Sequence, residues 1–264
     1  MNAKNLGPQA RVGRGGAVAR PRLATLGLAL LAAGPAWAES EPFNPDRPTF
    51  ADNPLTVPAG SFMLELGLEV DFADPPVKPI VGGTVRLGVA SDLEVRVGLP
   101  TLLRTDIGDA SELDLSDMSL GAKYHLPVAA IDLGLVLTVG VPTATGLFDD
   151  GAVEASLSLN ASKGVGGGFG VGGNVGATLT GLGGDETGQV VFGSGLATYT
   201  VNEALSLVGQ VFALQPVDGD LALGVGPAMY GSLASGVQVD FGLNFGVVGG
   251  LPDVLLRSGA SIQF

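Results

Sequence analysis

Charged side chains share one parity with other polar or small residues in several segments of this sequence. Glu65 and Glu69 share one parity of the first such segment, Arg86 lies in the next, and Glu94 and Arg96 share one parity of a third. Carboxylates and guanidinium groups arranged in this way can form ion pairs that satisfy buried charge. They can also line an aqueous passage and select solutes by charge. Both interpretations require the segments to point these side chains to one side.

The residues between these charges alternate in the same way and predict β-strands. Phe62, Leu64 and Leu66 fall on one parity, whereas Glu65 and Glu69 fall on the other. A period of two is that of a strand with one apolar and one polar face. Similar alternation predicts twelve strands, over residues 62–72, 80–89, 92–99, 116–126, 131–141, 153–163, 169–180, 189–201, 204–214, 220–230, 236–247 and 254–264. The phase of strands 189–201 and 204–214 is the least defined, because apolar residues occur on both parities.

The composition and the connections favour a membrane barrel over a soluble sheet. Charged residues make up 15% of the chain, against about 25% in ordinary soluble domains. Connections after odd-numbered strands are generally longer and acidic, and those after even-numbered strands are short. This asymmetry is typical of outer-membrane barrels. A β-sandwich seldom has a dozen strands of this length, and the short repeat of a β-solenoid is absent.

We therefore predict an all-β fold, a transmembrane antiparallel up-and-down β-barrel of about twelve strands, with ten or fourteen as alternatives. An even count puts both termini in the periplasm of a Gram-negative bacterium. We expect Phe264, the last residue of the sequence, to lie at the lipid interface. A terminal aromatic residue also resembles the C-terminal signal by which outer-membrane barrels are recognised for assembly.

The first 60 residues are predicted to lie outside the strands of the barrel. Residues 1–38 read as a signal peptide, with basic residues, an apolar stretch over 23–34 and a cleavage site at Ala36-Trp37-Ala38. That stretch is shorter than the roughly 20 residues of a membrane-spanning helix. Residues 39–60 are rich in proline, which cannot donate to a sheet ladder. They form either a periplasmic leader or a plug within the barrel, whose strands occupy residues 61–264.

The inner faces of the predicted strands carry the candidate site residues. We expect the lumen to be lined by Glu65, Glu69, Asp71, Arg86, Glu94, Arg96, Lys123, His125, Glu154, Asp240 and Arg257. Barrel closure should place Arg257 beside Glu65 or Glu69, and neighbouring strands should place Arg86 beside Glu94. Whether these charges fill the interior as ion pairs or form a selective constriction stays open.

The sequence offers little for catalysis or for metal binding. His125 is the only histidine and cysteine is absent, so the usual zinc sites lack ligands. Leu126 and Pro127 follow His125, so the His-x-Ser arrangement of outer-membrane phospholipases is missing. We predict no enzyme activity, no catalytic residue, no metal site and no cofactor.

One stretch resembles a known family. Pro54-Leu-Thr-Val-Pro-Ala-Gly60, preceded by Asp46-Arg-Pro48 and followed by Glu65 and Gly67, is similar to the opening of the outer-membrane transporter family linked to meta-pathway (MetA-pathway) phenol degradation. The resemblance implies passive passage of small, hydrophobic or aromatic molecules. A structural or surface-interaction barrel with a closed, charge-filled lumen is the alternative.

The predicted outer-membrane barrel also indicates the partners of the protein. Outer-membrane lipid, lipopolysaccharide, the barrel assembly machinery and a small-molecule solute are expected. Residues 39–264 hold 8 of the 13 Lys and Arg residues and all 26 acidic residues, a formal charge of −18. Nucleic acid is excluded as a partner, because phosphate binding needs a basic surface.

Overall fold

The computed structural model describes residues 42–72, 79–107, 110–146, 149, 151–184 and 187–264, and in this part of the chain every regular element is a β-strand. The strands are β1 (Phe62–Asp71), β2 (Pro79–Ala90), β3 (Leu93–Ile107), β4 (Ala110–Leu115), β5 (Met118–Val128), β6 (Ile131–Val141), β7 (Val153–Gly166), β8 (Phe169–Leu182), β9 (Gly188–Asn202), β10 (Leu205–Pro216), β11 (Ala222–Ala234), β12 (Val237–Val248) and β13 (Val254–Gln263). No helix long and apolar enough to cross a membrane occurs among the described residues.

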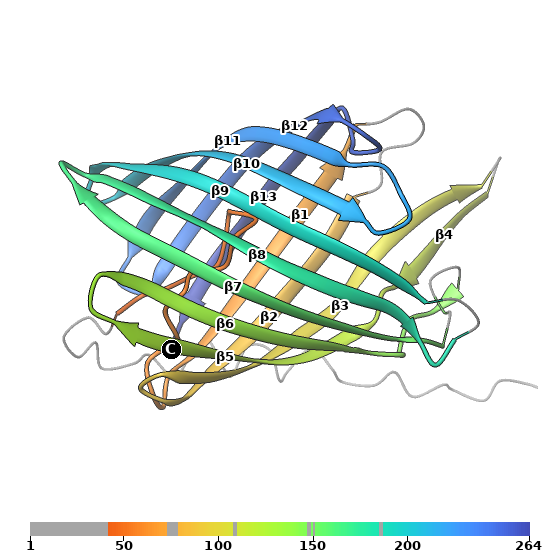
Figure 1. The fold of residues 1–264 in the computed structure, drawn as a ribbon, viewed down its shortest axis with the longest axis horizontal. Helices are drawn as coiled ribbons and strands as arrows, with labels where there is room; N and C mark the ends of the chain where they lie inside the picture. Colours follow the sequence, from red (N-terminus) through yellow and green to blue (C-terminus); the bar gives the residue numbers. More distant parts are fainter. Residues whose placement is uncertain (1–41, 73–78, 108–109, 147–148, 150, 185–186) are drawn as a thin grey trace, which may run out of the picture. The chain divides into compact units, whose positions relative to one another are not determined.

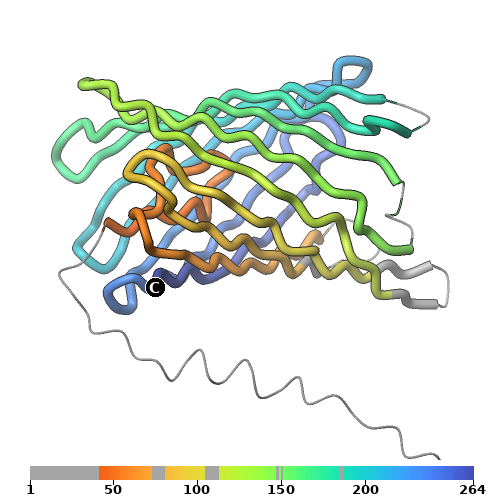
Figure 2. The backbone as a smooth tube through the Cα atoms, turned by 90° about the horizontal axis from the view of Figure 1, so that it is seen from below, coloured from red at the N-terminus to blue at the C-terminus, as the bar shows by residue number. Residues whose placement is uncertain are grey.

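The strands close into a ring. Each strand pairs antiparallel with its neighbours in the order β2-β1-β13-β12-β11-β10-β9-β8-β7-β6-β5-β3, and β2 pairs back to β3. Of the 13 described strands, β4 pairs only with β3 and lies outside the ring. The structure is therefore a closed barrel of twelve antiparallel strands, as the alternation predicted (Figures 1 and 2).

The hairpin formed by β3 and β4 is the main departure from the predicted elements. The sequence predicted a strand that ended near residue 99 and a loop over 100–115. Instead β3 continues to Ile107, and β4 turns back to pair Leu115 with Leu102. Beyond the barrel wall, the backbone of β4 pairs with the extended part of β3, so each segment provides hydrogen-bond partners for the other. The resulting arm projects from one end of the barrel (Figure 1).

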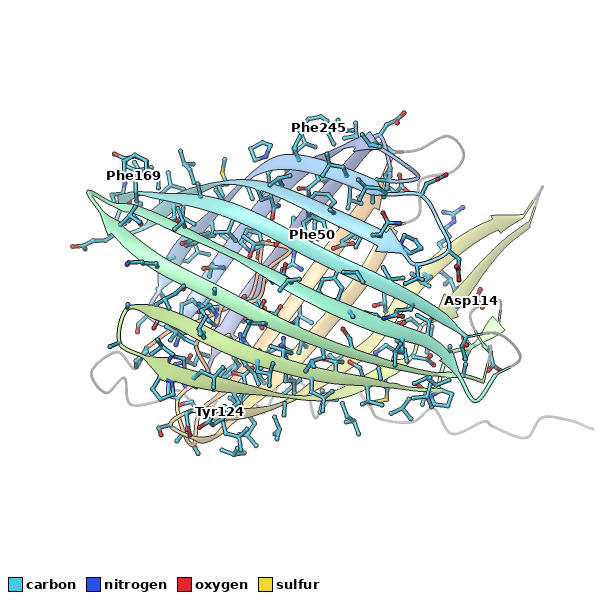
Figure 3. All side chains as sticks on the ribbon, viewed as in Figure 1. Phe50, Asp114, Tyr124, Phe169 and Phe245 are labelled. Atoms are coloured by element: carbon cyan, nitrogen blue, oxygen red, sulfur yellow. The ribbon has the colours of Figure 1, made fainter. Side chains whose placement is uncertain are left out.

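The two faces of the barrel wall differ as the alternation requires. In β1, Met63 is fully buried and Glu65 is 4% exposed, whereas Leu66 is 44% exposed. In β10, whose phase the sequence left undefined, Val208 and Phe212 point inward and Leu207 and Val211 are exposed. An apolar outer face over all strands is what lipid contact demands. Figure 3 shows two of its aromatic residues, Tyr124 and Phe169, on the outside of the barrel.

Candidate functional site: a segment across the lumen

Residues 42–60, which we call the plug segment, lie inside the barrel (Figures 1 and 2). Val57 is fully buried, and Ala51 is 3% exposed. The end of the segment runs beside β2, where Ala59 forms a parallel bridge with Gly88 and Gly60 N donates to Gly88 O over 2.8 Å. Thr56 Oγ1 donates to the Ser91 carbonyl in the β2–β3 turn. The last residues of the plug segment therefore lie at the end of the barrel that carries the short turns.

A buried charge cluster holds this segment against β1, β2 and β3. The Arg86 guanidinium donates twice to Glu94, over 2.8 Å in each case, and once to Glu65 over 2.7 Å. Arg86 and Glu94 are both 0% exposed, so the charges are removed from water and depend on one another. The pairing of Arg86 with Glu94 that the sequence predicted is therefore present. The plug segment joins the cluster through Val57 N, which donates to Glu94 Oε2 over 2.8 Å.

Asp46 is the plug segment's own contribution to this cluster. Its carboxylate accepts from Lys123 Nζ over 2.7 Å and from Arg96 over 2.7 Å, and it lies 3.3 Å from Arg86. Burial alone raises the pKa of Asp46, but the attraction of Arg86, Lys123 and Arg96 is stronger and holds that pKa well below its usual value. Asp46 is therefore ionised when the plug segment is docked. Asp52, also on the segment, pairs with Arg96 over 2.6 Å.

A second set of polar contacts connects the plug segment to β12 and β13, the strands that follow β1 around the barrel. Arg47 donates to both carboxylate oxygens of Asp240 on β12, each over 3.1 Å. Arg257 on β13 donates to Glu69 on β1 over 2.6 Å and to the Pro48 carbonyl over 3.2 Å. The pair expected between Arg257 and Glu65 or Glu69 forms with Glu69.

Neutral side chains complete the attachment and were not predicted. Asn160 on β7 accepts from Asp52 N, Asn174 on β8 donates to Phe50 O, Gln210 on β10 accepts from Phe50 N, and Gln238 on β12 donates to Arg47 O. All four amides face the lumen, and inner-face parity was the only sequence signal that could have identified them. They bind plug backbone, whose polar groups need partners once removed from water.

Glycines on the inner face make room for the plug backbone. A Cβ atom on Gly134 of β6 would lie 2.6 Å from the Pro54 carbonyl oxygen, and one on Gly88 would collide with the Pro58 carbonyl. At these two positions the wall must lack side chains for the segment to fit. These two glycines thus have a local explanation that alternation alone did not supply.

Space remains on both sides of the plug segment. A cavity of about 240 Å³ lies between it and the wall of β7, β8 and β9, where Ala161, Ser162, Gly172, Gly173, Leu196 and Thr198 line it. Another of about 370 Å³ lies toward β1, β2 and β3 and is lined by Arg47, Glu69, Thr84, Thr101 and Ser119. The lumen is narrowed by the segment without being filled.

Comparison with known proteins agrees with this architecture. The model of a family described as "Putative MetA-pathway of phenol degradation" matches residues 45–264. The chain belongs to this family. No curated protein matches it.

Three solved structures with the same fold are an outer-membrane channel and two porins by their titles. The COG4313 outer membrane channel from Pseudomonas putida F1 is similar with a TM-score of 0.60 and 14% identity, over 80% of this chain and 97% of that one. The KdgM porin gives a TM-score of 0.54 and 8% identity, over 76% and 99%. The NanC porin gives 0.53 and 11%, over 76% and 98%. This member of the phenol-degradation family is thus an outer-membrane β-barrel.

The remaining candidate residues of this family member lie apart from the plug segment. His125 Nε2 is 3.7 Å from the Asp132 carboxylate near a short turn. Glu154 lies beside a cavity of about 350 Å³ at the opposite end of the lumen, and Asp71 is half-buried at the end of β1. Phe264 stacks on Phe62 with ring centroids 4.6 Å apart. Ala36 and Ala38, the predicted cleavage residues, fall outside the described part of the chain.

Proposed function

We propose that this protein is a passive outer-membrane channel for small molecules, in which the plug segment narrows the pore. Hydrophobic or aromatic solutes are the proposed class, as the family resemblance implies. Passage of this kind needs no cofactor and no catalytic residue. We also propose that both termini face the periplasm, and that lipopolysaccharide surrounds the opposite end.

One observation carries the proposal, namely the cavity between the plug segment and the wall of β7 to β9. The inner face there carries Ser162, Gly172 and Thr198, which are small, so a gap persists beside the segment. Phe43, Leu196 and Tyr230 also line it, which gives the gap apolar as well as polar surface. A solute of modest size can pass such a constriction if it binds weakly at several places.

A second function is favoured by a different observation. Arg86, Glu94 and Lys123 are fully buried and paired, which supports a closed structural or surface-interaction barrel. In that case the lumen charges fix the plug segment permanently and the outer loops bind partners.

Conductance separates the two functions. The purified mature protein and a variant that lacks residues 42–58 are placed in planar bilayers, and flux of phenol and glycine into liposomes is followed in parallel. The channel proposal expects a small conductance from the full chain and a larger one from the deletion variant. A full chain that neither conducts nor admits either solute, beside a deletion variant that conducts, supports the closed barrel. Absence of conductance and flux from both proteins overturns the channel.

A further inference from the structure

A phenylalanine of the plug segment occupies an aromatic environment on the lumen wall. The ring of Phe50 stacks on Phe212 of β10, with centroids 3.8 Å apart and planes inclined by 22°. The Arg257 guanidinium lies over the Phe50 ring, 4.6 Å from its centroid. Figure 3 shows Phe50 between the strands, well inside the barrel. A ring in this position gains both stacking and cation–π attraction.

The wall beneath Phe212 is shaped to receive rings. A Cβ atom on Gly224, opposite Phe212 in β11, would collide with the Phe212 ring, so the absence of a side chain lets that ring lie flat against the wall. Phe212 itself is 6% exposed, and the Phe50 ring covers its free face. The stack therefore consists of a fixed ring on the barrel and a second ring supplied by the plug segment.

A buried side-chain amide on β12 carries a hydrogen-bond donor without a partner among the described residues. Asn244 on β12 is 1% exposed, and its Nδ2 has no partner among the described residues, although its Oδ1 accepts from Gln210 over 3.0 Å. The same Gln210 accepts the Phe50 amide through its Oε1. A buried N–H without an acceptor is costly. An oxygen atom on a ring bound against Phe212 would give this amide an acceptor.

We propose that Phe212, Arg257 and Asn244 form a binding subsite for a small aromatic molecule that carries a hydroxyl or carbonyl oxygen, and that the Phe50 ring occupies this subsite when no solute is bound. The solute ring stacks on Phe212 beneath Arg257, and its oxygen accepts from Asn244. This subsite deepens the proposed channel function, because it lies in the narrowed part of the lumen. A solute must displace only one side chain to bind.

The proposal is tested by binding rather than by flux. The mature protein in lipid nanodiscs is titrated with 4-fluorophenol and followed by ¹⁹F NMR line broadening, with empty nanodiscs as the background. Phenol and cyclohexanol serve as competitors, since they match in size and hydroxyl group but differ in aromaticity. Phe50→Leu removes the competing ring, and Phe241→Leu is the control, because Phe241 is exposed on the outer face of β12 and makes no ring stack among the described residues.

We expect Phe50→Leu to bind 4-fluorophenol about 3- to 10-fold more tightly than the native chain, the range that one ring stack represents. Phe241→Leu should bind as the native chain does. Adding Phe212→Leu to Phe50→Leu should abolish the gain, and phenol but not cyclohexanol should displace the probe. Equal binding by Phe50→Leu with and without Phe212→Leu, or displacement by cyclohexanol as effective as by phenol, overturns the subsite.

A measurement on the native sequence guards against a misfolded variant. Chain labelled with 4-fluorophenylalanine should show the ¹⁹F resonances of Phe50 and Phe212 shifted by phenol and unmoved by cyclohexanol; a spectrum that both alcohols leave unchanged overturns the subsite. Failure of the channel function gives a different result. Binding that is selective for phenol over cyclohexanol, without flux, supports the subsite and overturns the channel. Flux without such selectivity supports the channel and overturns the subsite.

Discussion

Arg257 of β13 lies directly opposite Glu69 of β1 in the strand register, and its Nε donates to the Glu69 carboxylate over 2.6 Å. These are the two strands that close the barrel. The ion pair therefore sits on the seam, where the last strand of the sequence meets the first. Arg257 also donates to the Pro48 carbonyl, so barrel closure and plug docking share one side chain.

Replacing Glu69 with glutamine should weaken the seam. A hydrogen bond to a charged group contributes about 1.5–3 kcal/mol, and Glu69 is partly solvated, so we expect a loss near the lower end, about 1–2 kcal/mol. Urea unfolding in lipid vesicles measures it. Asp253→Asn, which alters an exposed loop carboxylate, is the control. Indistinguishable unfolding of the two variants would show that the pair contributes nothing to closure.

Arg86→Met should be far more disruptive. It leaves the carboxylates of Glu65, Glu94 and Asp46 buried beside one fewer cation, and breaking a fully buried pair costs about 3–5 kcal/mol. The same unfolding assay should show a large fall in stability for Arg86→Met. The double variant Arg86→Met with Glu94→Met should recover part of it, since two of the mutually dependent charges are then gone. A double variant as unstable as the sum of the single ones would refute the coupling.

Acid should affect plug docking through Asp46 only at low pH. The pKa of Asp46 in the docked segment lies below its ordinary value of 3.8. Its contribution to docking is therefore complete above pH 3.8 and is lost as the pH falls toward the docked pKa. Protease cleavage of the plug segment, compared between the native chain and Asp46→Asn, tests this. The difference in cleavage should stay constant from pH 7 to about 5 and shrink below about 4; a difference that vanishes near pH 6 contradicts it.

The barrel wall could be predicted well from the sequence, because the alternation of apolar and polar residues identifies each strand from its own residues alone. Inner-face parity placed Arg86, Glu94 and Lys123 in the lumen, and closure placed Arg257 beside the first strand. The plug segment is different. Its residues Asp46 and Arg47 have no periodicity, and their partners lie on strands far away in the chain. The β3–β4 hairpin was missed for a different reason, since β4 pairs only with β3 and lies outside the ring of strands.

Phe264 should matter for assembly. Its backbone exchanges two hydrogen bonds with Phe62, over 2.8 and 3.1 Å, and its ring stacks on the Phe62 ring. Removing the residue deletes all three contacts at the seam. Deletion of Phe264 should lower the fraction of heat-modifiable, folded barrel in the outer membrane, whereas Phe264→Tyr should retain it. If the deletion variant assembles as efficiently as the tyrosine variant, the terminal aromatic plays no part in assembly.

The glycine at position 134 offers the most selective way to disturb the plug segment. A Cβ atom there would lie 2.6 Å from the Pro54 carbonyl oxygen and 2.7 Å from its Cα, too close for either atom to stay in place. Gly134→Ala should therefore displace the segment near Pro54 while leaving the β5–β6 and β6–β7 ladders intact. Conductance in planar bilayers should rise, and protease cleavage of residues 42–60 should accelerate.

Gly209→Ala is the matched control for this change. Gly209 lies within a strand of the same barrel and has no atom within 4 Å of a Cβ placed on it. Replacing glycine with alanine changes the conformational entropy lost on folding by a similar amount at both positions. A difference between the two variants therefore reports contact with the plug segment rather than the stability of the barrel wall. We expect Gly209→Ala to match the native chain in conductance and cleavage. If Gly134→Ala does so too, the segment does not depend on the space that this glycine leaves.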